Sequence, residues 1–173
     1  MNKHSIITII AIIVIAIPVI YGIWNAISAE NLELRSSDAT FRYFDMASNE
    51  KIEICNPNPF LVTINGLKIN VYYRDEIKGT FEVGPTTLGP QEDKLVEIKF
   101  SSESLEEVQY LFMHMDSEFT GEQVIRIDPR PMEITTTFDT RIIGVIPYQG
   151  QITQSGFDFA QMMNEDTTCK NNT

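Results

Sequence analysis

The sequence predicts an all-β body of antiparallel strands, arranged as a sandwich or a barrel, behind a single N-terminal transmembrane helix. The strands follow from about seven or eight short runs in which apolar and polar residues alternate, each bounded by turn residues. The helix follows from one long uncharged apolar run near the N-terminus. The 173 residues suffice for one domain with accessory segments, because domains usually contain about 100–200 residues.

The transmembrane segment is predicted from the uncharged run at residues 6–24. A helix needs about 20 apolar residues to cross a bilayer, so this run is long enough. Pro18 is compatible with the prediction because transmembrane helices tolerate proline. Tyr21 and Trp24 lie at the far end of the run, where amphipathic rings favour the membrane interface. We therefore predict a membrane anchor over residues 1–29.

A cleaved signal peptide is the alternative, because residues 26–29 (AISA) resemble a small-residue cleavage site. The apolar run exceeds the roughly 7–15 residues of a signal-peptide core, which favours a retained anchor. Lys3 and His4 precede the run, whereas Glu30 and Glu33 follow it. Since positive charge stays on the cytoplasmic side, we predict a cytoplasmic N-terminus and an extracytoplasmic body.

The body that follows the apolar run is strongly acidic. All 24 acidic residues lie after the run, and of the 13 basic residues only Lys3 precedes it, so the body carries a net charge of −12. Such a surface repels nucleic acid and anionic lipid headgroups, and the sequence has no basic patch of the kind that phosphate contacts need. We therefore expect no nucleic-acid partner and interpret the acidic excess as a solvated surface that keeps the domain soluble.

Period-two alternation predicts most of the strands. In the run LVEIKF, Val96, Ile98 and Phe100 lie on one face, opposite Glu97 and Lys99, which is typical of a strand with one solvated face. The other runs are rich in β-branched and aromatic residues. The expected strands cover residues 41–44, 51–54, 60–73, 80–83, 95–100, 123–128, 132–138 and 141–148.

Asn65 and Gly66 interrupt the longest of these runs. The pair is typical of a type I′ hairpin turn. A glycine inside a strand pattern also marks many β-bulges. The sequence leaves both alternatives open.

One segment of the body changes to helical spacing. In residues 104–116 the apolar side chains recur every three or four positions, and Ser104 with Glu107 matches a capping box. From Ala160 onward the sequence loses its periodicity, so we predict disorder there. Residues 151–173 are accordingly expected to form a C-terminal extension.

The segment CNPNPF places two Asn-Pro pairs directly after the alternating run KIEI. Proline has no backbone N–H for a sheet ladder and forces the preceding residue to be extended. The side chains of Asn56 and Asn58 can instead hydrogen-bond nearby backbone groups, as in Asx-turns. We therefore predict a rigid segment where the strand leaves its sheet and the chain changes direction.

This order of strands and turns resembles the group 2 late embryogenesis abundant family, which is also called the WHy domain family (water stress and hypersensitive response). The likeness extends from about Leu32 to Gly150, so the predicted domain covers residues 30–150. It rests on Asn-Pro-Asn-Pro at the end of one strand and on Leu-Gly-Pro before the next. The residues of this structural motif are Asn56, Pro57, Asn58, Pro59, Gly89 and Pro90.

The resemblance implies an immunoglobulin-like or fibronectin-like antiparallel β-sandwich with one short α-helix. It also implies a non-enzymatic role in desiccation, cold or other water stress, in which the domain shields proteins or membranes. Members occur in plants, bacteria and archaea, and many plant members carry an N-terminal transmembrane segment. Some relatives have been proposed to bind lipid within the sandwich. The family supplies no catalytic residues.

The residues themselves define no catalytic, metal-binding or cofactor-binding site. The chain has two histidines, His4 beside the apolar run and His114 in the predicted helix, and neither stands in a nucleophile or zinc pattern. No glycine-rich phosphate loop links a strand to a helix. Cys55 and Cys169 are able to form a disulfide in an exported protein. Because Cys169 lies in the predicted disordered tail, we expect no structural disulfide.

We expect a non-enzymatic, membrane-anchored domain that protects other proteins under stress or binds them. Its partners are the membrane, through the anchor, and protein clients. Two alternatives stay open: a lipid-handling domain with an apolar cavity, and an accessory subunit of a membrane complex that docks through residues 41–44 or the C-terminal segment. An enclosed apolar pocket would favour lipid handling, and a packed core would favour the protective or docking role.

Overall fold

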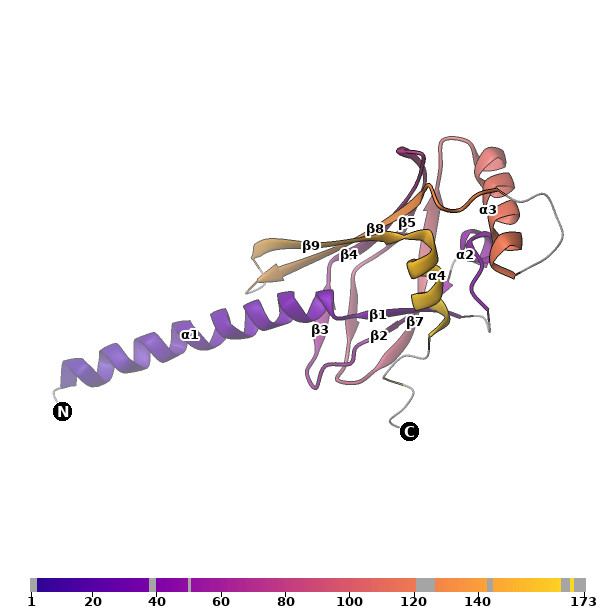
Figure 1. Cartoon of the computed structure of the whole chain (residues 1–173). Helices are drawn as coiled ribbons and strands as arrows, with labels where there is room; N and C mark the ends of the chain where they lie inside the picture. Colours follow the sequence, from indigo (N-terminus) through magenta and orange to yellow (C-terminus); the bar gives the residue numbers. More distant parts are fainter. Residues whose placement is uncertain are drawn as a thin grey trace.

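The computed structural model describes residues 3–37, 40–49, 51–120, 127–142, 145–165 and 169. In these residues a long N-terminal helix leads into an antiparallel β-domain that carries three further helices (Figure 1). Most of the strand expected at residues 123–128 lies outside the described residues. The elements are α1 (Lys3–Glu30), β1 (Glu33–Ser36), α2 (Tyr43–Asn49), β2 (Lys51–Cys55), β3 (Val62–Ile64), β4 (Gly66–Tyr73), β5 (Glu76–Val83), β6 (Thr86–Leu88), β7 (Asp93–Ser101), α3 (Leu105–Thr120), β8 (Met132–Ile142), β9 (Ile146–Ser155) and α4 (Gly156–Asn164).

The strands form one curled sheet with a small sheet beside it. The large sheet has seven strands in the order β1-β2-β7-β5-β4-β8-β9, and β3 pairs with β6 in a sheet of two strands. All of these pairings are antiparallel. Residues 93–97 of β7 pair with β2, whereas residues 98–101 pair with β5, so β7 joins the two halves of the curl. The predicted class, a body of antiparallel β-strands, is confirmed, and the strands form a curled sheet.

The helix α1 is the apolar helix that the sequence predicts. By length and composition it can cross a membrane. Its large apolar side chains, such as those of Val14 and Ile15, are exposed along most of its length. Only Asn31 and Leu32 separate α1 from β1, so the helix continues almost directly into the sheet.

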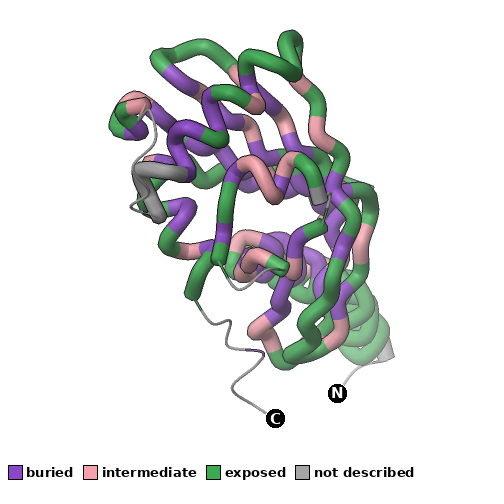
Figure 2. The backbone as a smooth tube through the Cα atoms, turned by 90° about the vertical axis from the view of Figure 1, so that its right-hand side faces the viewer, coloured by how far each residue is buried: buried purple, intermediate pink, exposed green. Residues whose placement is uncertain are grey.

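The core lies inside the curl, where Figure 2 shows the buried residues gathered. Aromatic rings fill much of this interior. The ring centroid of Tyr43 lies 4.8 Å from that of Phe41 and 5.7 Å from that of Phe112. The ring of Phe81 lies 4.8 Å from that of Phe100. These distances are those of rings in direct contact, so the space between the sheet and the helices is packed.

The predicted alternation holds where one face of a strand is buried. In β7, Val96 and Ile98 are buried, whereas Glu97 and Lys99 are exposed. In β8, the four residues predicted to share a face are all buried. They are Met132, Ile134, Thr136 and Phe138.

Neither alternative for Asn65 and Gly66 is right. β3 ends at Ile64 and pairs with β6, whereas β4 begins at Gly66 and pairs with β5 and β8. Between them, the backbone N–H of Asn65 donates to the carbonyl of Asp139 at 2.7 Å. The pair therefore marks the point where the chain passes from the small sheet to the large one.

The strand predicted at residues 41–44 is wrong, because α2 begins at Tyr43. The carboxylate of Asp116, in α3, accepts the backbone N–H groups of Tyr43 and Phe44, both at 2.9 Å. The N–H groups of a first helical turn have no partner within their own helix. A side chain from elsewhere in the fold thus caps α2, and Phe41 and Tyr43 are buried.

The helix α3 confirms the predicted change to helical spacing. It starts directly after Ser104, whose carbonyl accepts the backbone N–H of Val108 at 3.1 Å. Leu105 departs from the predicted apolar face, since it is exposed. The rest of that face is buried as predicted, namely Val108, Leu111, Phe112 and Met115. The expectation of a single helix in the body is wrong, because α2 and α4 accompany α3.

The C-terminal extension is ordered as far as Glu165, so the disorder predicted from Ala160 is wrong over this stretch. The side chain of Ser155 caps the first turn of α4, and Phe159 is fully buried in the core. The expected domain boundary at residue 150 falls inside β9, so β9 and α4 belong to the same body as the other strands. Beyond Glu165 only Cys169 is described.

Candidate functional site: the junction of α1 with the β-domain

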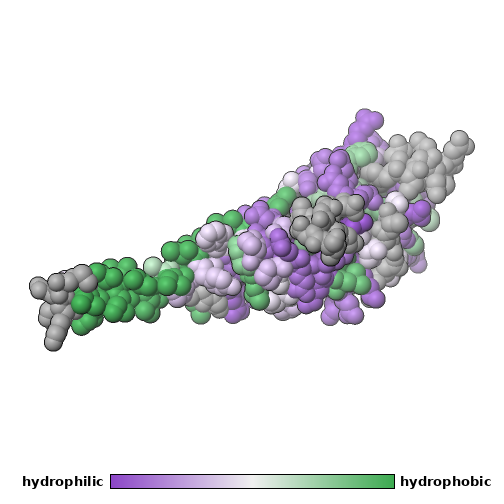
Figure 3. All heavy atoms as spheres, turned by 90° about the horizontal axis from the view of Figure 1, so that it is seen from below, coloured by the Kyte–Doolittle hydropathy of each residue, from purple (hydrophilic) through white to green (hydrophobic). Residues whose placement is uncertain are grey.

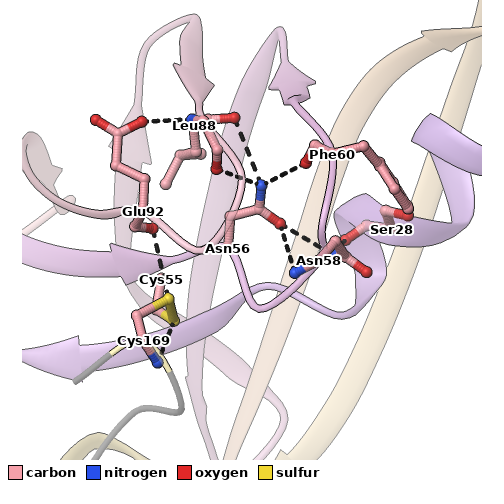
Figure 4. Close-up of a disulfide and its surroundings, with 9 residues drawn as sticks. Ser28, Cys55, Asn56, Asn58, Phe60, Leu88, Glu92 and Cys169 are labelled. Atoms are coloured by element: carbon pink, nitrogen blue, oxygen red, sulfur yellow. Dashed lines mark hydrogen bonds between the residues drawn. A yellow bond between two sulfur atoms is a disulfide. The ribbon is translucent and has the colours of Figure 1, made fainter. Parts of the chain in front are cut away.

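The Asn-Pro segment is organised around the side chain of Asn56, which is fully buried at the end of β2 (Figure 4). Its Nδ2 donates to the carbonyl oxygens of Phe60 at 2.9 Å and of Gly89 at 2.7 Å. Its Oδ1 accepts the backbone N–H of Asn58 at 3.1 Å. The predicted Asx-turn is therefore confirmed. One amide pairs three backbone groups that the end of the strand would otherwise leave without a partner.

The residues of the predicted motif divide into two groups. Asn56 and Gly89 are joined by the hydrogen bond described above, and the carbonyl of Asn58 accepts the N–H of Gln91 at 3.1 Å. The three prolines lie toward the surface and restrict the backbone through their rings. They are Pro57, Pro59 and Pro90.

The same segment contacts the end of α1. The Nδ2 of Asn58 donates to the carbonyl of Ser28 at 3.4 Å. The ring of Trp24 packs edge-on against that of Phe60, with 5.8 Å between the centroids. The last carbonyl groups of a helix have no partner within it. The Asn-Pro segment therefore supplies a donor to α1 and a surface on which its last turns lie.

Asn25 fastens α1 to the sheets, and sequence reasoning missed it. Its Oδ1 accepts the N–H of Thr63 at 3.1 Å, and its Nδ2 donates to the hydroxyl of Thr140 at 3.2 Å. That hydroxyl in turn donates to the carbonyl of Thr63 at 2.7 Å. Ala26 and Ala29 are almost fully buried. The signal in the sequence was a polar asparagine, followed by small residues, at the end of an apolar run.

Cys55 and Cys169 form a disulfide, with 5.9 Å between their Cα atoms, so our expectation of no structural disulfide is wrong. Cys55 is the last residue of β2 and precedes Asn56 (Figure 4). Both cysteines are buried. The bond closes a loop with a sequence separation of 114 residues, so the C-terminal tail is joined covalently to the Asn-Pro segment.

A cavity of about 490 Å³ lies between α1 and the β-domain. It is open to solvent, and its lining combines apolar side chains with one guanidinium group and with the polar side chains of Asn25, Thr63, Asn65 and Thr140. From α1 it is lined by Pro18 and Tyr21, and from the β-domain by Leu61 and Arg141. Because Tyr21 stands near the end of the predicted span, the cavity lies where a membrane interface would meet the domain.

Asp116 is a buried acid on α3, and its surroundings shift its pKa. Burial raises the pKa of Asp116 to about 6, against the opposing effect of the N–H groups of Phe44 and Tyr43. Burial also raises the pKa of Tyr43, and the carboxylate of Asp116 adds to that shift. This arrangement indicates a structural role for Asp116, since both of its carboxylate oxygens cap α2.

The described residues include no group of three or more His, Cys, Asp or Glu side chains that could hold a metal ion. His114 is buried on α3, and its Nδ1 lies 2.8 Å from the carbonyl oxygen of Tyr110 in the preceding turn. Its ring also packs against the ring of Tyr110, with 4.0 Å between the centroids. His114 is therefore held as part of the helix packing.

No protein-family model and no curated protein matches the chain. Solved structures similar to it include the crystal structure of a protein from Archaeoglobus fulgidus, which has 12% sequence identity and a TM-score of 0.28. That likeness covers 72% of this chain and 94% of the other chain. A likeness of this size bears on neither fold nor function. The comparisons assign no family, so the resemblance to group 2 late embryogenesis abundant proteins stays a prediction.

Proposed function

We propose that the chain is a single-pass membrane protein whose anchor is retained and whose β-domain stands against the membrane surface. The observation that carries this proposal is the junction of α1 with the sheets. Cleavage within residues 26–29 would remove Asn25 and its hydrogen bonds to Thr63 and Thr140. It would also expose the surface that Ala26 covers. A segment that is buried against the β-domain and hydrogen-bonded to it is expected to stay in the mature protein.

The proposed orientation places the β-domain outside the cytoplasm. Lys3 precedes the span and Glu30 follows it, which supports a cytoplasmic N-terminus. The disulfide between Cys55 and Cys169 supports the same orientation, because such bonds persist mainly in oxidising compartments. Mass spectrometry of the N-terminal peptide from membranes, with protease accessibility of the domain, tests both retention and orientation.

The proposed fold class is an immunoglobulin-like or fibronectin-like sandwich, with the curled sheet as its two layers. The division of β7 supports this interpretation, because residues 93–97 pair with one half of the sheet and residues 98–101 with the other. The aromatic rings between α3 and the sheet would then belong to the hydrophobic core of the sandwich.

The proposed activity is non-enzymatic protection or binding of proteins at the membrane surface. The acidic surface supports this proposal, since like charges oppose the close approach of neighbouring acidic proteins. Screening limits such effects to about 8–10 Å at physiological salt. A charged domain therefore acts only on neighbours close to it, and the direct connection of α1 to β1 holds it where membrane-bound neighbours are. The resemblance to stress-protective domains motivates the choice of desiccation and cold as conditions.

The experiment uses the full chain in liposomes, because α1 and Cys169 both belong to the fold. One reporter enzyme is attached to the same liposomes and an identical one is left free in solution, and both go through freeze–thaw and drying. An unrelated domain of equal net charge on the same α1 is the control. We expect the chain to preserve the attached reporter better than the control does. Equal survival with both proteins would refute the protective role.

The packed interior counts against the lipid-handling alternative, which needs an enclosed apolar cavity. The docking alternative also changes, because Phe41 and Tyr43 are buried and cannot serve as a docking surface. A partner protein that copurifies in fixed ratio from mild detergent would favour the accessory-subunit role over the protective one.

A further inference from the structure

The hairpin of β8 and β9 extends beside α1 toward the N-terminal side of the helix, beyond the other strands (Figure 1). Two contacts fix the hairpin against the helix. Asn25 bonds to Thr140 of β8, and the hydroxyl of Tyr148 on β9 donates to the carboxylate of Glu30. Thr140 and Tyr148 face each other in the ladder. The hairpin and the last turns of α1 are therefore joined across both strands.

The end of the hairpin lies level with the end of the predicted span. Ile142 stands two residues beyond Thr140, which is about 7 Å along a strand. The same distance covers about four to five residues of a helix, and from Asn25 this leads back to the level of Tyr21. The position of Arg141 agrees, because it lines the same cavity as Pro18 and Tyr21. The strand end is thus at the depth where Tyr21 marks the membrane interface.

The surface of this hairpin end suits a lipid environment. Val145 is 73% exposed and Ile146 is 51% exposed. From Arg141 to Tyr148 the chain contains no acidic residue, although the body as a whole is acidic. Figure 3 shows the hydrophobic surface of α1 reaching the point where the helix meets the β-domain. Exposed apolar patches mark contacts with proteins, ligands or membranes, and the apolar helix α1 beside this patch favours a membrane.

We propose that the end of the β8–β9 hairpin, with Val145 and Ile146, is a second membrane contact that enters the leaflet from which α1 emerges. Its occupant is the phospholipid of that leaflet at the boundary between headgroups and acyl chains. The arginine at the end can extend its guanidinium back to the lipid phosphates. The inference rests on the proposed membrane span.

The test measures depth in the full chain, reconstituted in phosphatidylcholine liposomes. Both native cysteines form the disulfide, so a cysteine at position 145 can be labelled selectively with a nitrobenzoxadiazole fluorophore. Val145→Cys is compared with Ile77→Cys, a control site that is also exposed and lines a groove with Glu107 of α3. Val14→Cys on α1 reports the span itself. If Val145→Cys does not fold with its disulfide intact, Ile146→Cys replaces it.

We expect nitroxide-labelled lipid to quench the fluorophore at positions 14 and 145, with iodide quenching at 145 several-fold below that at 77. A probe at 145 that behaves like the probe at 77, while the probe at 14 is quenched by lipid, would overturn the hairpin inference and leave the anchor intact. An unquenched probe at 14 would overturn the anchor and with it this inference. Protection at 145 that disappears on dilution of the protein into more lipid would assign the hairpin end to a second copy of the chain and overturn the inference.

Discussion

Replacing Asn56 by alanine is expected to destabilise the protein more than alanine at Pro57, Asn58 or Pro59 does. The substitution removes the donors to the carbonyl groups of Phe60 and Gly89 and the acceptor for the N–H of Asn58. Each such hydrogen bond contributes a net of about 1 kcal/mol, so the loss is about 3 kcal/mol. A change of this size lowers the melting temperature of a protein this long by about 6–12 °C.

The assay is thermal unfolding of the full chain in detergent, followed by the β-sheet signal in circular dichroism. Asn70→Ala is the matched control, since its side chain accepts one hydrogen bond, from Thr80, on a partly exposed face. Asn56→Asp keeps the shape but places a carboxylate against two carbonyl oxygens. We expect it to be at least as unstable as Asn56→Ala at neutral pH and to recover in acid, where the protonated acid can donate one bond.

Two results would refute this reasoning. One is a melting temperature for Asn56→Ala within experimental error of the Asn70→Ala control. The other is an Asn56→Asp variant as stable as the unmodified protein at neutral pH, since it would mean that the carbonyl groups of Phe60 and Gly89 do not depend on the amide.

Three further predictions concern the same body. Changing Cys55 and Cys169 to serine should lower stability by up to about 4–5 kcal/mol by the chain-entropy estimate for so long a loop; a denaturation midpoint unaffected by reductant would contradict this. The pKa of Asp116 is about 6 in the folded protein and 3.8 ordinarily. The protonated carboxyl group of Asp116 therefore contributes to the free energy of unfolding below about pH 4, and this contribution is lost as the pH rises through about 6. Asp116→Asn should therefore remove up to about 3 kcal/mol of that pH dependence, and parallel urea midpoints for both proteins between pH 4 and 7 would count against it. Replacing Pro57 and Pro59 by alanine should lower the free energy of unfolding by about 0.4–1 kcal/mol for each proline, because the unfolded chain becomes freer; an unchanged melting temperature would remove their architectural role.

The features that the sequence predicts correctly are those whose causes lie close along the chain. The alternation of Val96 and Ile98 with their charged neighbours is visible because one face of β7 is buried. The Asx-turn at Asn56 is visible because its acceptor and donor groups lie within four residues, at Asn58 and Phe60. In both cases the local pattern and the final fold agree.

The features that the sequence hides depend on distant partners. The alternating pattern around Tyr43 predicts a strand, but Asp116 caps a helix there. The sequence hides this helix because Asp116 lies 73 residues away. The partner of Cys55 is 114 residues away, and Asn25 meets Thr140 across 115 residues. No window along the chain contains both members of such a pair, so periodicity cannot reveal them.

The helix α4 is an intermediate case, because part of its signal was present in the sequence. Its buried residues Gly156, Phe159, Ala160 and Met163 follow the three- and four-residue spacing of an amphipathic helix. Ser155 stands in the capping position. The glycine at the start and the polar tail that follows weaken the pattern, and the packing of Phe159 in the core decides the outcome.

Several long-range contacts meet at the Asn-Pro segment, which therefore links distant parts of the chain. Cys55 joins the C-terminal tail to the end of β2, and Asn56 joins that end to Gly89. Two residues later, Asn58 reaches the carbonyl of Ser28 on α1. The helix α1, the sheet and the C-terminal tail are thereby held by one short segment, and its prolines restrict the backbone of that segment. A domain held in this way cannot swing freely about α1, so under the proposed membrane span the depth of its hairpin end follows from the position of α1. Substitutions that weaken the contacts of this segment should therefore change the iodide quenching of a probe at position 145 more than that of a probe at position 14.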